Sequence, residues 1–171
     1  YNGAMVIMGK SKEILYEQRL SPEDAEQIIE LGEKYGTTIV VWADNKMFVK
    51  EINEKVLDYK KISNVEPTVI DDLREAVKAG ATKILWYDEI DKINKYRTEV
   101  GKYLSDGVNF HPSRPIFLEF VDKKASKAIA MEKLGEHFGI KRSEMIAVGD
   151  GYNDLSMIEY AGLGVAMGNA E

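Results

Sequence analysis

The sequence contains no cysteine, and this absence limits its chemistry. Without thiols the chain has no disulfide, no thiolate metal site and no cysteine nucleophile. A chain without cysteine suits a reducing compartment, so we expect a cytoplasmic protein. The sequence also lacks any apolar run near the roughly 18 residues that a membrane-spanning helix requires. We therefore expect no membrane partner.

Basic residues are also in the minority. The 23 Lys and Arg against 29 Asp and Glu give a formal net charge of −6. A general nucleic-acid binder needs a basic face, so we expect no nucleic-acid partner. The chain of 171 residues is 44% hydrophobic and 30% charged, which is typical of a folded domain and excludes disorder. The length predicts one domain, or one small domain with an insert.

The last third of the chain alternates helices with short apolar strands. We expect a helix from about 126 to 138, a strand at 145–148, a short helix at 154–161 and a strand at 163–167. Alternation of this kind is typical of a parallel sheet with helices on its faces. The apolar run at 5–8 similarly predicts a strand buried on both faces, followed by a more polar returning strand at 13–20.

The middle of the chain instead mixes hairpins with helices. Its clearest helix starts with Ser21 as N-cap and Pro22 at the first position, and stops at Gly36. Trp42 and Trp86 fall in expected strands and are predicted to pack in its core. We therefore predict an α+β module inserted into a doubly wound α/β module. The predicted boundaries give segments 1–16, 17–115 and 116–171, with the middle segment as the insert.

Candidate chemistry begins in the loop Gly149–Asp154, directly after an expected strand. Open α/β sheets bind ligands at the carboxyl ends of their strands. Asp150 and Asp154 offer the hard oxygen ligands that suit Mg²⁺, with Asn153 between them. An ordinary turn is the competing interpretation, because Asp, Asn and Gly also favour turns.

A second candidate is Lys127, which follows the expected N-cap Ser126. A cation in the first turn opposes the helix dipole, so its presence there suggests that it neutralises an anion. A solvated lysine, with Lys123 and Lys124 nearby, is the competing interpretation. His111, beside Pro112, is interpreted as a turn residue, and the lining of a pocket in the inserted module is the alternative. His137 is interpreted as a helix-surface residue.

Three segments resemble motifs of the haloacid dehalogenase-like (HAD) phosphatases, and most closely the Cof-type branch. The run from Gly149 to Ala170 resembles the fourth motif of that family, and Ser126-Lys127 before an amphipathic helix resembles the third. Asn2-Gly3-Ala4, followed by an apolar strand, is similar to the segment that leads into the family's inserted cap. The resemblance implies an α/β fold with a partial Rossmann-like, doubly wound parallel-sheet core and an inserted α+β cap.

The resemblance also implies a mechanism and roles for particular residues. The family's members hydrolyse phosphomonoesters through an aspartyl-phosphate intermediate, with Mg²⁺ as cofactor. Asp150 would then bind Mg²⁺, and Asp154 would support the metal's ligand shell, directly or through water. Lys127 would pair with the phosphoryl oxygens and the nucleophile carboxylate. Asn153 would form a hydrogen bond with the substrate or with the second shell of the metal. The expected substrate is a small phosphorylated metabolite, such as a sugar phosphate.

Two motifs of the family are missing from this sequence. Neither the Asp-x-Asp-Gly-Thr run, which carries the nucleophile, nor the Ser or Thr of the second motif is present. We therefore expect the nucleophile to lie outside this stretch and the isolated stretch to be inactive. Its core strands would lack neighbours, which predicts self-association. The alternative is a catalytically inactive HAD-like module that binds a phosphorylated ligand or a protein. The sequence upstream of Tyr1 distinguishes the two.

Overall fold

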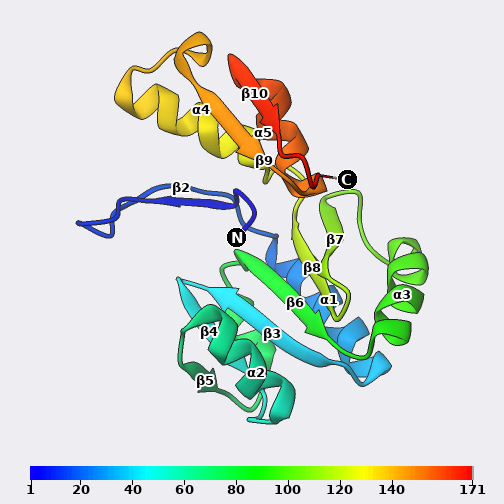
Figure 1. Ribbon diagram of the computed structural model, residues 1–171. Coiled ribbons are helices and arrows are strands. Elements are labelled where there is room, and N and C mark those ends of the chain that lie inside the picture. Colours follow the sequence, from blue (N-terminus) through cyan, green and yellow to red (C-terminus); the bar gives the residue numbers. More distant parts are fainter. Residues whose placement is uncertain (171) are drawn as a thin grey trace. The chain divides into compact units, whose positions relative to one another are not determined.

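The computed structural model describes residues 1–170 and divides the chain into two compact units. One consists of Tyr1–Gln18 together with Lys124–Glu171, and we call it the terminal unit. The other, Arg19–Lys123, we call the inserted unit (Figure 1). The inserted unit interrupts the terminal unit once along the chain. Within residues 1–170, the helices are all too short or too polar to cross a membrane.

The inserted unit is built on a sheet of six strands in the order β5-β4-β3-β6-β8-β7. All neighbouring strands run antiparallel except β4 and β5, which are parallel. The strands are β3 (Thr38–Ala43), β4 (Lys46–Val49), β5 (Pro67–Val69), β6 (Lys83–Tyr87), β7 (Val108–Arg114) and β8 (Phe117–Asp122). His111 thus lies within a strand, and its interpretation as a turn residue is wrong.

Strand β8 also decides where the inserted unit ends. It pairs with both β6 and β7, so it belongs to the six-stranded sheet. The predicted boundary between residues 115 and 116 falls in the turn of the β7–β8 hairpin, and the observed boundary follows Lys123. The prediction was wrong because alternation along a strand does not say which sheet the strand joins.

Helix α1 (Pro22–Tyr35) has the end signals that the sequence predicted. The Ser21 hydroxyl accepts a hydrogen bond from the Asp24 amide at 3.1 Å, and Pro22 occupies the first turn. Gly36 ends the helix at φ 67°, a left-handed conformation that glycine adopts without strain. These local bonds satisfy backbone groups that a helix end would otherwise leave unpaired.

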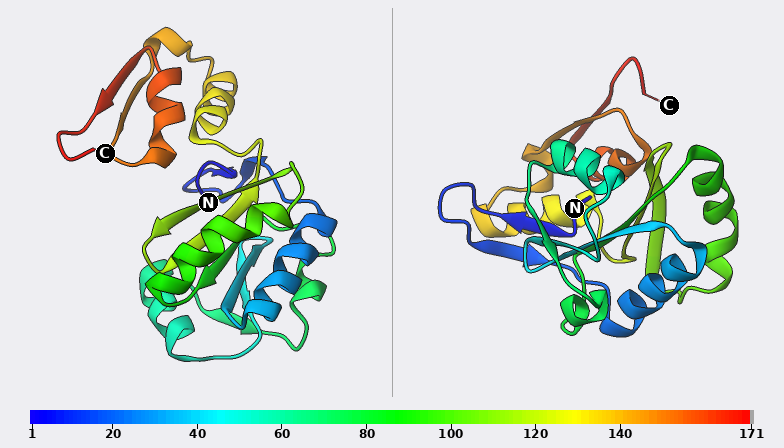
Figure 2. Two further views of the ribbon diagram at one scale, coloured as in Figure 1. Left: turned by 90° about the vertical axis from the view of Figure 1, so that its right-hand side faces the viewer. Right: turned by 90° about the horizontal axis from the view of Figure 1, so that it is seen from below.

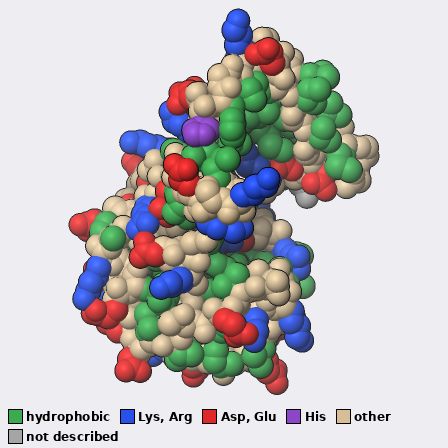
Figure 3. Space-filling model, turned by 90° about the vertical axis from the view of Figure 1, so that its left-hand side faces the viewer, with side chains coloured by type: hydrophobic (Ala, Val, Ile, Leu, Met, Phe, Trp, Pro, Cys, Tyr) green, Lys and Arg blue, Asp and Glu red, His purple; other side chains and the backbone are tan. Residues whose placement is uncertain are grey.

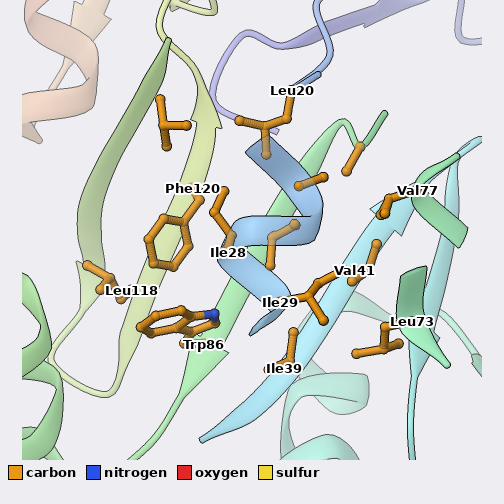
Figure 4. Close-up of a cluster of buried hydrophobic side chains, with 14 of the residues drawn as sticks. Leu20, Ile28, Ile29, Ile39, Val41, Leu73, Val77, Trp86, Leu118 and Phe120 are labelled. Atoms are coloured by element: carbon orange, nitrogen blue, oxygen red, sulfur yellow. The ribbon is translucent and has the colours of Figure 1, made fainter. Parts of the chain in front are cut away.

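The main core lies between one face of this sheet and the helices that cover it. Helix α1 and helix α3 (Ile90–Glu99), which the short helix η2 (Val100–Lys102) extends, lie on that face (Figure 2). The short 3₁₀ helix η1 (Leu73–Val77) packs there too. Trp86 belongs to this cluster and lies beside Phe120, fully buried as predicted (Figure 4).

Helix α2 (Glu54–Ser63) packs on the opposite face of the sheet. The indole N–H of Trp42 donates to the Tyr59 hydroxyl at 3.1 Å, and the Tyr59 ring meets Phe117 edge-on. Trp42 is also buried, so the prediction that both tryptophans pack in the inserted unit is confirmed.

A buried carboxylate joins three elements of this unit. Asp88 follows β6 and accepts hydrogen bonds from Lys55 of α2 at 2.7 Å and from Tyr96 of α3 at 3.0 Å. Lys92 and the Glu89 amide donate to it as well. Burial by itself would raise the pKa of Asp88, but these donors favour the charged form and hold the pKa below its ordinary value.

This lowered pKa predicts acid sensitivity of the inserted unit. A carboxyl group whose pKa is lower in the folded state stabilises that state fully above its unfolded value, near 3.9. We expect this stabilisation to disappear as the pH falls through the lower, folded value. Urea unfolding followed by tryptophan fluorescence between pH 7 and 3 measures it, since both tryptophans lie in this unit. In Asp88→Asn the part of the pH dependence due to Asp88 should vanish. An unchanged profile would contradict the assignment.

The terminal unit combines two small sheets with two helices. Strands β1 (Met5–Ile7) and β2 (Ile14–Glu17) form an antiparallel hairpin, and β9 (Ile146–Gly149) and β10 (Leu163–Ala166) pair in parallel. The helices are α4 (Lys127–Phe138) and α5 (Leu155–Tyr160), joined to the strands by the short 3₁₀ helices η3 (Arg142–Glu144) and η4 (Tyr152–Asp154). The predicted strand–helix alternation of this segment is confirmed.

One face of the parallel pair is exposed. Ile146 and Val148 of β9 are 65% and 54% exposed, whereas Ala147 packs with Met145 and Ala161 beneath. Hydrophobic side chains are visible on the outside of the terminal unit (Figure 3). Within residues 1–170, β9 and β10 pair only with each other and β1 pairs only with β2. Ile7 of β1 is exposed, so the prediction that this strand is buried on both faces is wrong.

Candidate active site

The site residues lie where two helices of the terminal unit begin. Lys127 is the first residue of α4, and its N-cap Ser126 accepts a hydrogen bond from the Ile129 amide at 3.2 Å. Asp150 follows β9 directly, and Asp154 ends the short helix η4 that leads into α5. The structure thus places the acidic loop at the carboxyl end of a parallel strand, the usual ligand position in an α/β sheet.

An ion pair joins the two predicted motifs. The Lys127 ammonium group donates to Asp154 Oδ1, although the residues lie 27 positions apart. This contact favours a specific role over a solvated Lys127, because the ammonium group has a buried carboxylate as its partner. The Lys127 side chain itself is half-buried, so part of it reaches solvent.

Asp154 also holds the loop that precedes it. Its Oδ2 atom accepts from the backbone amides of Asp150 at 3.1 Å and Gly151 at 3.2 Å, and the residue is only 6% exposed. The hydrogen bond from Lys127 is the main cause that holds the pKa of Asp154 below its ordinary value. Burial opposes this effect, and the two amides reinforce it. Asp154 is therefore an internal anchor that stays ionised.

Glycine is required at position 149 for this arrangement. A Cβ atom there would lie 2.3 Å from the Cβ atom of Asp154, closer than two non-bonded carbon atoms can approach. The absent side chain lets the end of β9 lie directly against the anchoring carboxylate.

Asp150 differs from Asp154 in its surroundings. Its side chain is exposed, and its Oδ2 atom accepts one hydrogen bond from the Asn169 amide at 3.3 Å. Residues 1–170 contain no cluster of three or more acidic or histidine side chains that could hold a metal ion together. The two aspartates therefore have different roles. Asp154 holds the loop in place, and Asp150 exposes its carboxylate to solvent.

Comparison with known proteins identifies the family. The model of the haloacid dehalogenase-like hydrolases matches residues 1–171. The chain belongs to this family. A haloacid dehalogenase-like hydrolase from Bacteroides thetaiotaomicron has 32% sequence identity and a TM-score of 0.87, and the match covers 100% of this chain and 65% of that one. The Thermotoga maritima protein TM0651 also has 32% sequence identity, with a TM-score of 0.85. That match covers 100% of this chain and 64% of TM0651.

A curated relative extends the comparison to a named activity. The 5-amino-6-(5-phospho-D-ribitylamino)uracil phosphatase YitU of Bacillus subtilis is 27% identical over 158 residues, which are 90% of this chain and 58% of that protein. The first two curated relatives are each covered over 64% of their length. The chain therefore spans less than two thirds of the length of these curated relatives.

The residues of this HAD chain fit a magnesium ion on chemical grounds. Mg²⁺ is usually held by one or two carboxylates and completes its shell with water and substrate phosphate. The exposed Asp150 carboxylate offers one such ligand. Both carboxylate oxygens of Asp154 already accept hydrogen bonds, Oδ1 from Lys127 and Oδ2 from the loop amides. Asp154 therefore suits a supporting role better than direct ligation of the metal.

The structure adds two asparagines to the site. Asn169 donates to Asp150, as described above, and Asn2 accepts a hydrogen bond from the predicted substrate residue Asn153 at 3.4 Å. Asn169 lies within the run that resembles the fourth motif, and Asn2 lies in the segment that leads into the cap. Sequence reasoning gave neither a role, because their partners are 19 and 151 positions away. His137 is exposed on α4, as predicted, and takes no part.

Proposed function

We propose that the protein containing this chain is a Mg²⁺-dependent phosphomonoester hydrolase. The observation that carries the proposal is the Lys127–Asp154 ion pair beside the exposed Asp150, in a chain that belongs to the HAD hydrolases. This arrangement supplies a cation for phosphoryl oxygens and an anion for a metal within one short loop system. The buried Asp154 carboxylate contacts both Lys127 and the acidic loop. An ordinary turn or a solvated lysine would not require such a contact.

Each residue has a stated task in this proposal. Lys127 stabilises the negative charge on the transferring phosphoryl group, with its ammonium group oriented by Asp154. Asp150 binds Mg²⁺, which when bound neutralises phosphate charge. Asn153 donates a hydrogen bond to the substrate or to a water on the metal. The nucleophile that forms the aspartyl-phosphate is an aspartate outside these 171 residues.

The substrate that we propose is a small phosphorylated metabolite, such as a sugar phosphate. The relative YitU is named for a phosphorylated ribityl compound, which is of this class. The inserted unit is proposed to act as the cap that selects the substrate. A cytoplasmic location, and the absence of nucleic-acid and membrane partners, belong to the same proposal. Self-association of the separate chain through its exposed strands is proposed as well, and size-exclusion chromatography tests it.

The proposal predicts that activity needs both the metal and the rest of the protein. The full-length protein should hydrolyse p-nitrophenyl phosphate with added Mg²⁺ and lose nearly all turnover in excess EDTA, because Lys127 alone does not replace the phosphate charge that the metal neutralises. A chain that starts at Tyr1, its mass confirmed, should show no turnover with Mg²⁺ present.

Two results would contradict this function. If turnover is unchanged in EDTA, the proposal that Asp150 binds a catalytic metal is wrong. Absence of turnover in a full-length protein that carries Asp-x-Asp-Gly-Thr upstream of Tyr1 would favour the inactive HAD-like binding module instead.

A further inference from the structure

The first four residues form a turn whose conformation is fixed. Asn2 and Gly3 have φ angles of 52° and 91°, both in the left-handed region. Asparagine is one of the few residues with a side chain that tolerates this region, and glycine adopts it freely. The Ala4 amide closes the turn on the Tyr1 carbonyl at 2.9 Å, and Ala4 is fully buried.

The turn packs directly against the start of α4. A Cβ atom at Gly3 would lie 2.3 Å from the carbonyl carbon and oxygen of Ser126 and 2.5 Å from the Lys127 nitrogen. Backbone therefore rests on backbone, at the peptide from which the Lys127 side chain departs. Only glycine fits this approach, since the neighbouring atoms belong to the main chain and have no freedom to rotate away.

The same turn reaches the acidic loop through a side chain. Asn2 Oδ1 accepts from Asn153 Nδ2 at 3.4 Å, a contact between residues 151 positions apart. Asn153 lies in η4 and is exposed, and its hydrogen bond to Asn2 ties its side chain to the turn. One short turn thus contacts both segments that carry the site, although it belongs to neither motif.

We propose that Asn2 and Gly3 are positioning residues of the phosphate site. Gly3 sets the position of the α4 N-terminus and with it Lys127, and Asn2 orients the amide of Asn153 toward the bound phosphoryl group. Neither residue touches the phosphate itself. This inference rests on the proposed function, and it adds two residues that act on phosphate affinity from outside the two motifs.

The test uses the full-length protein and inorganic phosphate as the probe. Asn2→Gly removes the acceptor oxygen but keeps the left-handed backbone free of strain. We expect the inhibition constant for inorganic phosphate and the KM for p-nitrophenyl phosphate to rise about 3- to 10-fold, as the loss of one hydrogen bond implies. The kcat should change less than about twofold, because no group that reacts is removed.

A double-mutant cycle shows whether Asn2 acts through Asn153. When Asn153→Ala is already present, Asn2→Gly should change phosphate affinity less than about 1.5-fold. The matched control is Asn64→Gly, since Asn64 ends α2 with φ 54° and lies in the inserted unit. This control should leave phosphate affinity unchanged. Gly3→Ala should weaken phosphate binding more than Asn2→Gly does, and circular dichroism verifies that each variant folds.

The outcomes separate this inference from the proposed function. If the wild-type protein neither hydrolyses phosphomonoesters nor is inhibited by phosphate, the proposed function is wrong. If the wild type is active, two results would contradict the positioning role of Asn2 and leave the proposed function intact. In the first, Asn2→Gly keeps the phosphate inhibition constant and KM of the wild type. In the second, the effect of Asn2→Gly is equally large with and without Asn153→Ala, which would indicate only a general loss of structure.

Discussion

Replacing Asp150 by asparagine is expected to remove most of the Mg²⁺-dependent phosphatase activity without loss of stability. The amide keeps the size of the side chain but takes away the anionic ligand. A metal stabilises phosphoryl transfer by several kcal/mol, and each increment of about 1.4 kcal/mol is tenfold in rate, so we expect kcat/KM to fall about 100-fold or more. Turnover of p-nitrophenyl phosphate across a Mg²⁺ titration measures this loss.

The structure predicts that stability is spared because Asp150 contributes little to the fold. Its side chain is exposed and accepts a hydrogen bond from Asn169 Nδ2 at 3.3 Å. Asp154→Asn should behave differently. It removes a buried charge that pairs with Lys127 and accepts from two backbone amides, so it should lower both activity and the unfolding free energy.

The matched control for this pair is Asp71→Asn, an exposed aspartate of the inserted unit. Its activity and melting temperature should equal those of the wild type. Activity of Asp150→Asn within a few-fold of the wild type would remove Asp150 from the metal site. Equal stability losses in Asp150→Asn and Asp154→Asn would contradict the division of work between the two carboxylates.

The parts of the site that were predictable from sequence are those whose partners are close along the chain. Ser126 as N-cap and Lys127 in the first turn follow from backbone bonds within four residues. The acidic loop follows from its place after an apolar strand. The buried state of Asp154 was not predictable, because Asp150 and Asp154 look alike in a sequence. What distinguishes them is the approach of Lys127 from a different helix.

The same distinction applies to the fold. Both ends of α1 were predicted because caps are local, and the strand–helix alternation after residue 124 was predicted from its periodicity. The predicted end of the inserted unit was wrong because β8 belongs to that unit through its pairing with β6 and β7. This pairing is not visible in the local sequence of β8. The prediction of a doubly buried strand at 5–8 failed because a short apolar run also suits an exposed hairpin strand.

A buried ion pair in the inserted unit gives the second large expected effect. Lys83 Nζ donates to Glu119 Oε1 at 3.1 Å, and the two residues are 8% and 6% exposed. The Ser113 hydroxyl donates to the same oxygen at 2.9 Å. Burial raises the pKa of Glu119, but the Lys83 charge, these two hydrogen bonds and His111 outweigh it and keep the pKa below its ordinary value.

Removal of Glu119 alone should lower the free energy of unfolding by far more than the intact Lys83–Glu119 pair contributes to it. Glu119→Leu leaves the Lys83 ammonium group buried without its counter-charge, and such losses are typically about 3–5 kcal/mol. Urea unfolding followed by tryptophan fluorescence should show this loss, because both tryptophans belong to the same unit. As a control, Glu30→Gln breaks the exposed pair with Lys34 and should change stability by less than about 0.5 kcal/mol.

The double variant Lys83→Met with Glu119→Leu separates charge burial from packing. Both charges are then replaced by apolar side chains of similar length, which is often neutral or stabilising for a buried pair. The exposed Ser113 hydroxyl turns to water, so it adds little cost. We expect the double variant to regain most of the stability that Glu119→Leu loses. If instead it is as unstable as the single variant, the pair contributes through its specific hydrogen bonds, and the cost of an unpaired charge is not the cause.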